Sequence, residues 1–535
     1  MSDPRARRMF GANGSPDLAT SPFRVDRDRI ASSPFFGRLG GVTQVISPGG
    51  SGLLVHNRLT HSLKVAQVAR AVAERLAADP RYGDLLTRLG GCDPDVVEAA
   101  ALAHDLGHPP FGHLGESTLD RLARTRLGLA DGFEGNAQSY RIVTSTEIRA
   151  PAGRATIGLD LTAAVRAALL KYPWTRHGGL AGYPHPHPST LDPAPRGASA
   201  PAVDPASGSS KFSAYSTELA DLRQARAPFA GVLPDWQQTV EASIMDTADD
   251  IAYAIHDVED FHRVGVLQSG SVGNELLTWQ REAKALAELT EPVLAAGVRR
   301  PGYATELLRR QLRRKDAWIS DDDAFAAAVE VVRTELVEGL LATGFDGSLD
   351  AELAVSAFSA RWTRRLVDAL AVVADPPVRS GHLVLAPAQW HEVQVLKLVH
   401  RRFVLQRPDL ALHQRGQAAA LTTLVESLWA WVNDPDETAR LPQRLADLIE
   451  LADAELADTE LADAELADRK LADTGPSDAG AGASTVDSVP LTRRQRAQGR
   501  AIVDFVAALT DSQAVALSDA LAGRQGPLWT DAFVL

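Results

Sequence analysis

Apolar residues recur at helical spacing along most of the chain, and this periodicity restricts the possible fold more than any other feature. In the segment 61–76 they keep largely to one side of a helix, and Asp93 with Pro94 forms a favourable helix start before the next apolar segment. Strand-like alternation is scarce, because only residues 42–45 and 53–55 could form a short hairpin. The sequence therefore predicts an all-α fold with at most that hairpin. Further helical patterns cover 239–262, 324–341, 353–373, 391–404, 417–432 and 495–521.

The 535-residue chain is 45% hydrophobic and 23% charged, which is typical of a globular protein with a sizeable core. Its single cysteine, Cys92, excludes an intramolecular disulfide framework and a cysteine-rich zinc site. No stretch approaches the ~18 uncharged apolar residues of a membrane span, and residues 1–10 lack the apolar region of a secretory signal. A net charge of −13 argues against broad, salt-driven binding to DNA. We expect a cytoplasmic protein that does not contact a membrane.

The acidic charge concentrates in a repeat near the C-terminus, where Leu-Ala-Asp recurs every five residues from 451 to 473. A five-residue period turns successive leucines by ~140° around a helix, so they do not form one buried stripe. This pattern predicts a solvated acidic insertion at 445–490 that ends in a flexible connector, with a partner-binding arm as the alternative. The remaining predicted parts are a flexible N-terminus at 1–20, a helical domain at 21–444 with a Pro/Ala/Ser-rich loop at 188–210, and a helical segment at 491–535.

Histidines gather in one part of the sequence. Five of the 14 lie between residues 56 and 113, and three of these fall within the run 104–113. There a helix of small apolar residues ends on His104-Asp105 and is broken at Gly107 and Pro109, which allows side chains at the helix end to converge. Neutral imidazole and carboxylate groups together suit Mn²⁺, Fe²⁺, Co²⁺ or Mg²⁺. The run therefore predicts part of a divalent metal site.

Other ligands are expected on separate helices. His61 opens an upstream helix, and a run of acids interrupts the apolar helix predicted at 239–262. Asp249, Tyr253 and Asp257 are spaced i, i+4, i+8 and so share one helix face, whereas Asp250 points ~100° away. Polar groups at this spacing on a half-apolar helix are costly to bury without partners, which favours a site over a solvated face.

The order His61…His104-Asp105…Asp249 resembles the H…HD…D metal signature of the HD phosphohydrolase superfamily. The surrounding blocks resemble more narrowly the deoxyguanosinetriphosphate triphosphohydrolase-like family. These blocks are residues 58–63, 104–113, 133–138 and 248–253, together with 26–30 and 43–45 near the start and a weaker match at 504–511.

The resemblance implies an HD-type helical core that hydrolyses a 2′-deoxynucleoside triphosphate, with dGTP as the candidate preferred substrate, to the deoxynucleoside and inorganic triphosphate. It also implies a divalent metal cofactor, Mn²⁺ or Mg²⁺, with Fe²⁺ or Co²⁺ as alternatives. The implied metal ligands are His61, His104, Asp105 and Asp249.

The same resemblance implies roles around the metal. His113 is the candidate for proton transfer, and Glu116 would hold the tautomer of the His113 ring. His108 would extend beyond the metal ligands toward the substrate. The implied phosphate-binding residues are Arg58, Lys171 and Lys211, and those lining the sugar are Gln44, Asn136, Tyr253 and Asp257. The ring of Tyr253 would leave no room for a ribose 2′-hydroxyl. The stretch Gly40-Gly41-Val42 departs from the family because it lacks the basic residues often found there.

The expected partners are the dNTP substrate, a dNTP allosteric effector, single-stranded DNA, and further copies of the chain in a homo-oligomer, with a hexamer suspected from the resemblance. Two alternatives remain open. One is another HD phosphohydrolase, acting on nucleoside monophosphates, cyclic nucleotides or alarmones. The other is a nucleotide-binding or single-strand-binding module with weak catalysis, which the acidic balance and the 6% aromatic content disfavour.

Overall fold

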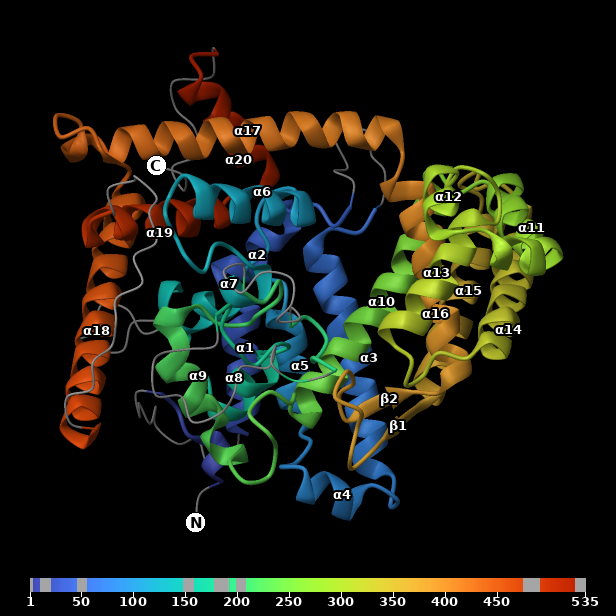
Figure 1. Cartoon of the computed structure of the whole chain (residues 1–535), viewed down its shortest axis with the longest axis horizontal. Helices are drawn as coiled ribbons and strands as arrows, with labels where there is room; N and C mark the ends of the chain where they lie inside the picture. Colours follow the sequence, from blue (N-terminus) through green and yellow to red (C-terminus); the bar gives the residue numbers. More distant parts are fainter. Residues whose placement is uncertain are drawn as a thin grey trace. The chain divides into compact units, whose positions relative to one another are not determined.

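The computed structural model describes residues 3–9, 21–45, 55–147, 158–177, 191, 193–198, 208–474 and 491–524. The predicted connector at 475–490 lies outside these residues, as do most of the predicted N-terminal stretch and most of the loop at 188–210. Of the two predicted hairpin segments only residues 53–54 lie outside them, and residues 42–45 are not part of a strand, so the described residues do not bear out this hairpin. The described chain is mainly helical, with a single two-stranded sheet, which confirms the predicted fold class (Figure 1). None of the described helices is long and apolar enough to cross a membrane.

The chain divides into two compact units, each assembled from separate stretches of sequence. The first unit comprises Met1–Val45, Leu102–Gln238 and Gly416–Leu535, and the second comprises Ile46–Ala101 and Thr239–Arg415. The helices that lie wholly or mainly in the first unit are α1 (Pro22–Ala31), α2 (Pro34–Arg38), α6 (Gly112–Thr125), α7 (Gly135–Arg141), α8 (Ala163–Leu169), α9 (Leu219–Arg226), α17 (Pro408–Val432), α18 (Gln443–Thr474), α19 (Arg493–Ala507) and α20 (Asp511–Leu521).

The core of the first unit is formed by apolar side chains of α6, α17, α18, α19 and α20. Helix α18 packs against α19. Leu445, Leu448, Ile449 and Ala452 of α18 are buried, whereas Leu461 is 65% exposed. The solvated insertion predicted from residue 445 is therefore wrong at its start. The reason is that these four residues stand at i, i+3, i+4 and i+7 and form one apolar face before the five-residue period takes over.

The second unit contains the antiparallel ribbon of β1 (Leu370–Val372) and β2 (Leu383–Leu385), in which Leu370 pairs with Leu385 and Val372 with Leu383. Helix α10 packs against α3, α15 and α16. The helices that lie wholly or mainly in this unit are α3 (Arg58–Ala78), α4 (Gly83–Arg88), α5 (Pro94–Ala103), α10 (Val240–Arg263), α11 (Ser269–Glu288), α12 (Glu291–Ala296), α13 (Tyr303–Lys315), α14 (Asp322–Val332), α15 (Leu349–Asp368) and α16 (Pro387–His400).

Two predicted helices end earlier than expected. The helix expected over 353–373 stops at Asp368, because the residues that follow pair as β1 with a strand that local periodicity does not reveal. The helix expected over 495–521 is interrupted between Ala507 and Asp511. There Thr510 starts a new helix, since its side chain accepts a hydrogen bond from the backbone N–H of Gln513.

Candidate active site

Helix α3 begins with a capping box that places His61 in its first turn. The Asn57 side chain accepts from the backbone N–H of Thr60 at 3.0 Å, and the Thr60 hydroxyl accepts from the backbone N–H of Asn57 at 3.1 Å. His61 is buried, and its Nε2 lies 3.1 Å from Oδ1 of Asp249 on α10. Two predicted metal ligands from distant parts of the sequence are thus side by side within the second unit.

His104 and Asp105 follow the end of α5, in a loop with a demanding geometry. Oδ1 of Asp105 lies 3.5 Å from Nε2 of His104 and 2.9 Å from Nδ1 of His108. The hydroxyl of Ser139 accepts from the backbone N–H of Gly107 at 2.9 Å and donates to the carbonyl of His104 at 2.8 Å. A Cβ on Gly107 would lie 2.1 Å from the backbone nitrogen of Ser139, so glycine is required for this close approach.

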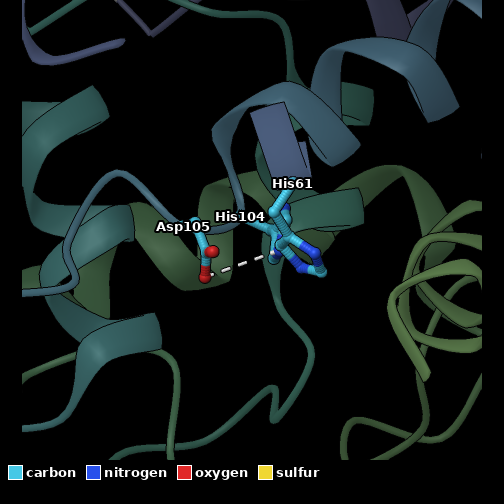
Figure 2. Close-up of side chains that lie close together, drawn as sticks. All are labelled: His61, His104 and Asp105. Atoms are coloured by element: carbon cyan, nitrogen blue, oxygen red, sulfur yellow. Dashed lines mark ion pairs between the residues drawn. The ribbon is translucent and has the colours of Figure 1, made fainter. Parts of the chain in front are cut away.

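Figure 2 shows the side chains of His61, His104 and Asp105 close together, and their potential ligand atoms all lie within 4.8 Å of one another. All three residues are buried. Two imidazoles and a carboxylate form a donor set that suits a divalent first-row cation or Mg²⁺. The residues present therefore fit the metal that the sequence predicts, with Asp249 as the candidate fourth ligand through its contact with His61.

A second group of polar side chains surrounds the start of α6. Nδ1 of His113 lies 3.1 Å from Oε2 of Glu116, and the His113 side chain is 65% exposed. Nζ of Lys211 pairs with Oε1 of Glu116 at 2.5 Å and with Oε1 of Glu134 at 2.9 Å. Burial would raise the pKa of Glu116, but the hydrogen bond with His113 and the charge of Lys211 hold it well below its ordinary value. Glu116 is therefore ionised and accepts a hydrogen bond from Nδ1 of His113, which leaves Nε2 of His113 for other partners.

The polar face of α10 meets a histidine of α16 that the sequence did not single out. Nδ1 of His400 lies 2.8 Å from Oδ2 of Asp257 and 3.1 Å from the hydroxyl of Tyr253, and the ring of Phe261 stacks on the imidazole. Burial and the charge of Asp257 raise the pKa of Tyr253, so its hydroxyl stays protonated. The cost of burying this face indicates that some partner is needed, but no local pattern identifies His400 as that partner.

Sequence reasoning also missed the residues that support His61. The ring of His256 stacks on His56 with centroids 4.4 Å apart and meets the ring of His61 edge-on at 5.9 Å. Asp260 accepts from the backbone N–H of His56 at 2.9 Å, and its other oxygen lies 2.7 Å from Nδ1 of His56. These contacts place a histidine stack against the first turn of α3, where the candidate ligand His61 stands.

The remaining predicted residues are placed as follows. Arg58 is buried at the start of α3, and its charge acts on the Tyr253 hydroxyl. The side-chain nitrogen of Asn136 donates to Glu134 at 2.9 Å. Lys171 and Gln44 are half-buried. Asp250 pairs with Lys397 at 2.8 Å. The contacts of these residues with a substrate stay predictions.

Residues 58–170 match the HD domain family. With the helical fold and the His61, His104 and Asp105 group, this match defines the protein as an HD-domain hydrolase.

The chain is 32% identical over 447 residues to a deoxyguanosinetriphosphate triphosphohydrolase-like protein of Streptomyces coelicolor, an alignment that covers 81% of this chain and 87% of the relative. Proteins of the same name from Corynebacterium efficiens and Corynebacterium diphtheriae are 31% identical over 424 residues and 33% identical over 417 residues. These alignments cover 77% and 76% of this chain, and 80% of each relative. The chain belongs to the deoxyguanosinetriphosphate triphosphohydrolase-like family.

Proposed function

We propose that this protein hydrolyses 2′-deoxynucleoside triphosphates to the deoxynucleoside and inorganic triphosphate, with dGTP as the candidate preferred substrate. The observation that carries the proposal is the buried His61, His104 and Asp105 group, whose donor atoms suit a divalent cation. The names of the relatives support a deoxynucleotide as substrate.

A divalent cation, Mn²⁺ or Mg²⁺, held by His61, His104, Asp105 and Asp249 would supply Lewis acidity at the α-phosphate and lower the pKa of water. Arg58 offers a planar fork of donors to the phosphate oxygens. We assign Lys171 and Lys211 to the triphosphate as well. Because Lys211 pairs with Glu116 and Glu134, a phosphate group would have to compete with these two carboxylates.

The reaction breaks the bond between the α-phosphorus and the 5′-oxygen, and water supplies the hydroxyl that phosphorus gains. The departing 5′-oxygen needs a proton, because an alkoxide leaves poorly. We assign this transfer to His113. Its Nδ1 faces the ionised Glu116, so Nε2 is the atom that would carry the proton to the 5′-oxygen. His108, whose ring centroid lies 5.5 Å from that of His113, would line the same region.

Anion-exchange chromatography of the products tests this proposal. Each of the four dNTPs is incubated singly and in mixtures with purified protein and Mn²⁺ or Mg²⁺. We expect deoxynucleoside and inorganic triphosphate in equal amounts. Monophosphate or diphosphate products would move the protein to another HD phosphohydrolase activity. Nucleotide-dependent stabilisation without turnover would leave only a binding module.

Sugar selection gives a second test. We assign the sugar contacts to Gln44, Asn136, Tyr253 and Asp257, and propose that the Tyr253 ring excludes a ribose 2′-hydroxyl. Tyr253→Ala should lower the ratio of kcat/KM for dNTP over NTP by about 10- to 100-fold, a range typical of pocket-shape discrimination. Tyr253→Phe is the matched control, because it keeps the ring and should keep the discrimination. Full rejection of ribonucleotides by Tyr253→Ala would refute the steric explanation.

The family resemblance also supports a homo-oligomer, with a hexamer as the candidate state, a dNTP effector and single-stranded DNA as a further partner. Activity that appears only with mixed dNTPs would indicate the effector. Sedimentation with and without nucleotide would report the oligomeric state.

A further inference from the structure

The C-terminal part of the chain contributes a buried carboxylate to the loop that carries His108 and His113. Asp511 is the first residue of α20, and its Oδ1 accepts a hydrogen bond from the backbone N–H of Phe111 at 2.9 Å. Its Oδ2 accepts from the backbone N–H of Thr43 at 3.1 Å and from the hydroxyl of the same residue. All three residues belong to the first unit. One carboxylate thus joins two segments that are about 400 and 470 residues away in sequence.

The contact with Phe111 fixes a turn with an unusual backbone. Phe111 has a φ of 66°, in the left-handed region that residues other than glycine adopt only when their surroundings determine it. It is also the N-cap of α6, two residues before His113 and five before Glu116. The hydrogen bond from its N–H to Asp511 therefore holds the point from which α6 presents the His113–Glu116 pair.

The contact with Thr43 fixes the other segment. Thr43 directly precedes Gln44, which we assign to the sugar. A Cβ on Gly41 would lie 2.7 Å from the side chain of Thr510, so this stretch packs closely against the start of α20. This close packing gives a physical reason for glycine at position 41.

Arg38 reinforces the same connection from a second direction. Its guanidinium donates to the carbonyl oxygens of Leu106, His108 and Leu509, each at 2.8 Å. The loop 104–113 is therefore held to residues 509–511 by one buried cation that binds its carbonyls and one buried anion that binds an amide.

We propose that Asp511 is a positioning residue of the active site, which sets the sugar-binding Gln44 and the proton-transferring His113 relative to each other through Thr43 and Phe111. This inference rests on the proposed function for the roles of Gln44 and His113. It assigns a part in the reaction to the C-terminal segment, which carries no residue of the predicted site.

Kinetics with dNTP and with 2′,3′-dideoxynucleoside triphosphate test this role, because the pair differs only in the 3′-hydroxyl that a polar sugar contact would recognise. Asp511→Asn replaces one acceptor oxygen by an amide group that cannot accept. It should lower kcat by about 10- to 100-fold, as expected when a catalytic group is displaced by about 1 Å, and reduce the preference for dNTP over the dideoxy analogue. Thr43→Val removes only the hydroxyl contact, so it should reduce that preference and raise KM more than it lowers kcat.

Asp519→Ala is the matched control on α20, since Asp519 forms an exposed pair with Arg524, and it should behave like the unmodified protein. A merely structural role for Asp511 would lower the amount of folded enzyme without changing the dNTP/dideoxy ratio. Unchanged kcat and an unchanged ratio in folded Asp511→Asn would overturn the proposal.

Hydrogen exchange separates this proposal from the proposed function. In Asp511→Asn the amides of Thr43 and Phe111 should exchange faster, whereas the amide of Gly107, held by Ser139, should stay protected. If the unmodified protein does not turn over dNTPs, the proposed function fails. Faster exchange at both amides would then still support the coupling, by which we mean that Asp511 holds Thr43 and Phe111 together. Unchanged exchange at both amides would refute the coupling itself.

Discussion

Asp105→Ala is expected to lower dNTP hydrolysis by about 10³-fold or more and to remove the bound metal. Asp105 lies beside His104 and His108 and within the group formed with His61, so its loss removes a carboxylate donor from the candidate centre. A catalytic cation contributes several kcal/mol of charge stabilisation in the transition state, and each ~1.4 kcal/mol is a factor of ten in rate. The measurements are kcat/KM by anion-exchange chromatography and the metal content of protein loaded with Mn²⁺.

The neighbouring acids of α10 provide a matched pair for the same experiment. Asp249, 3.1 Å from His61, should behave like Asp105 when replaced with alanine. Asp250 pairs with Lys397, so Asp250→Ala should retain the metal and most of the activity. Equal metal loss in both variants, or full metal content in Asp105→Ala, would contradict the assigned ligand set.

Arg141→Met is expected to destabilise the protein by about 3–5 kcal/mol, independently of its activity. The guanidinium of Arg141 is fully buried and pairs with Glu218 at 2.6 Å, Glu455 at 2.8 Å and Asp504 at 2.9 Å. Burial disfavours the charge, but the three carboxylates hold the pKa of Arg141 well above its ordinary value. Removing the cation leaves buried acids without compensation, which costs far more than losing a surface ion pair.

Urea unfolding at two pH values measures this effect. Burial raises the pKa of Glu218, and the charge of Arg141 partly offsets this rise. The pKa of Glu218 should therefore rise further in the Arg141→Met variant. A carboxyl whose folded-state pKa is raised binds its proton more tightly in the folded state, so protonation at low pH stabilises the fold. The loss of unfolding free energy in the variant, relative to the unmodified protein, should therefore be smaller near pH 5 than near pH 8. Arg124→Met removes an exposed pair with Asp120 and should cost about 1 kcal/mol or less. Equal effects of the two substitutions would show that the buried cluster does not stabilise the fold.

The helical class could be predicted because it depends on local periodicity. The helix predicted over 61–76 is found as α3, and the one predicted over 239–262 is found as α10. The metal candidates could be proposed for a related reason, since His104-Asp105 stands where an apolar helix meets Gly107. Residues this close in sequence constrain one another whatever the rest of the chain does.

The tertiary structure decided the contacts that no local pattern records. Leu445 and Ile449 begin a core helix where the sequence suggested a solvated insertion, and Glu455 of the acidic repeat neutralises Arg141. His400 joins Tyr253 and Asp257, and Asp511 joins Thr43 to Phe111. Each of these side chains meets a partner from a distant part of the sequence, which is selected by the packing of whole helices and by the cost of leaving a buried charge or polar group unpaired. Periodicity and motif spacing determined which elements form and which residues are chemically capable, whereas burial determined which of them meet.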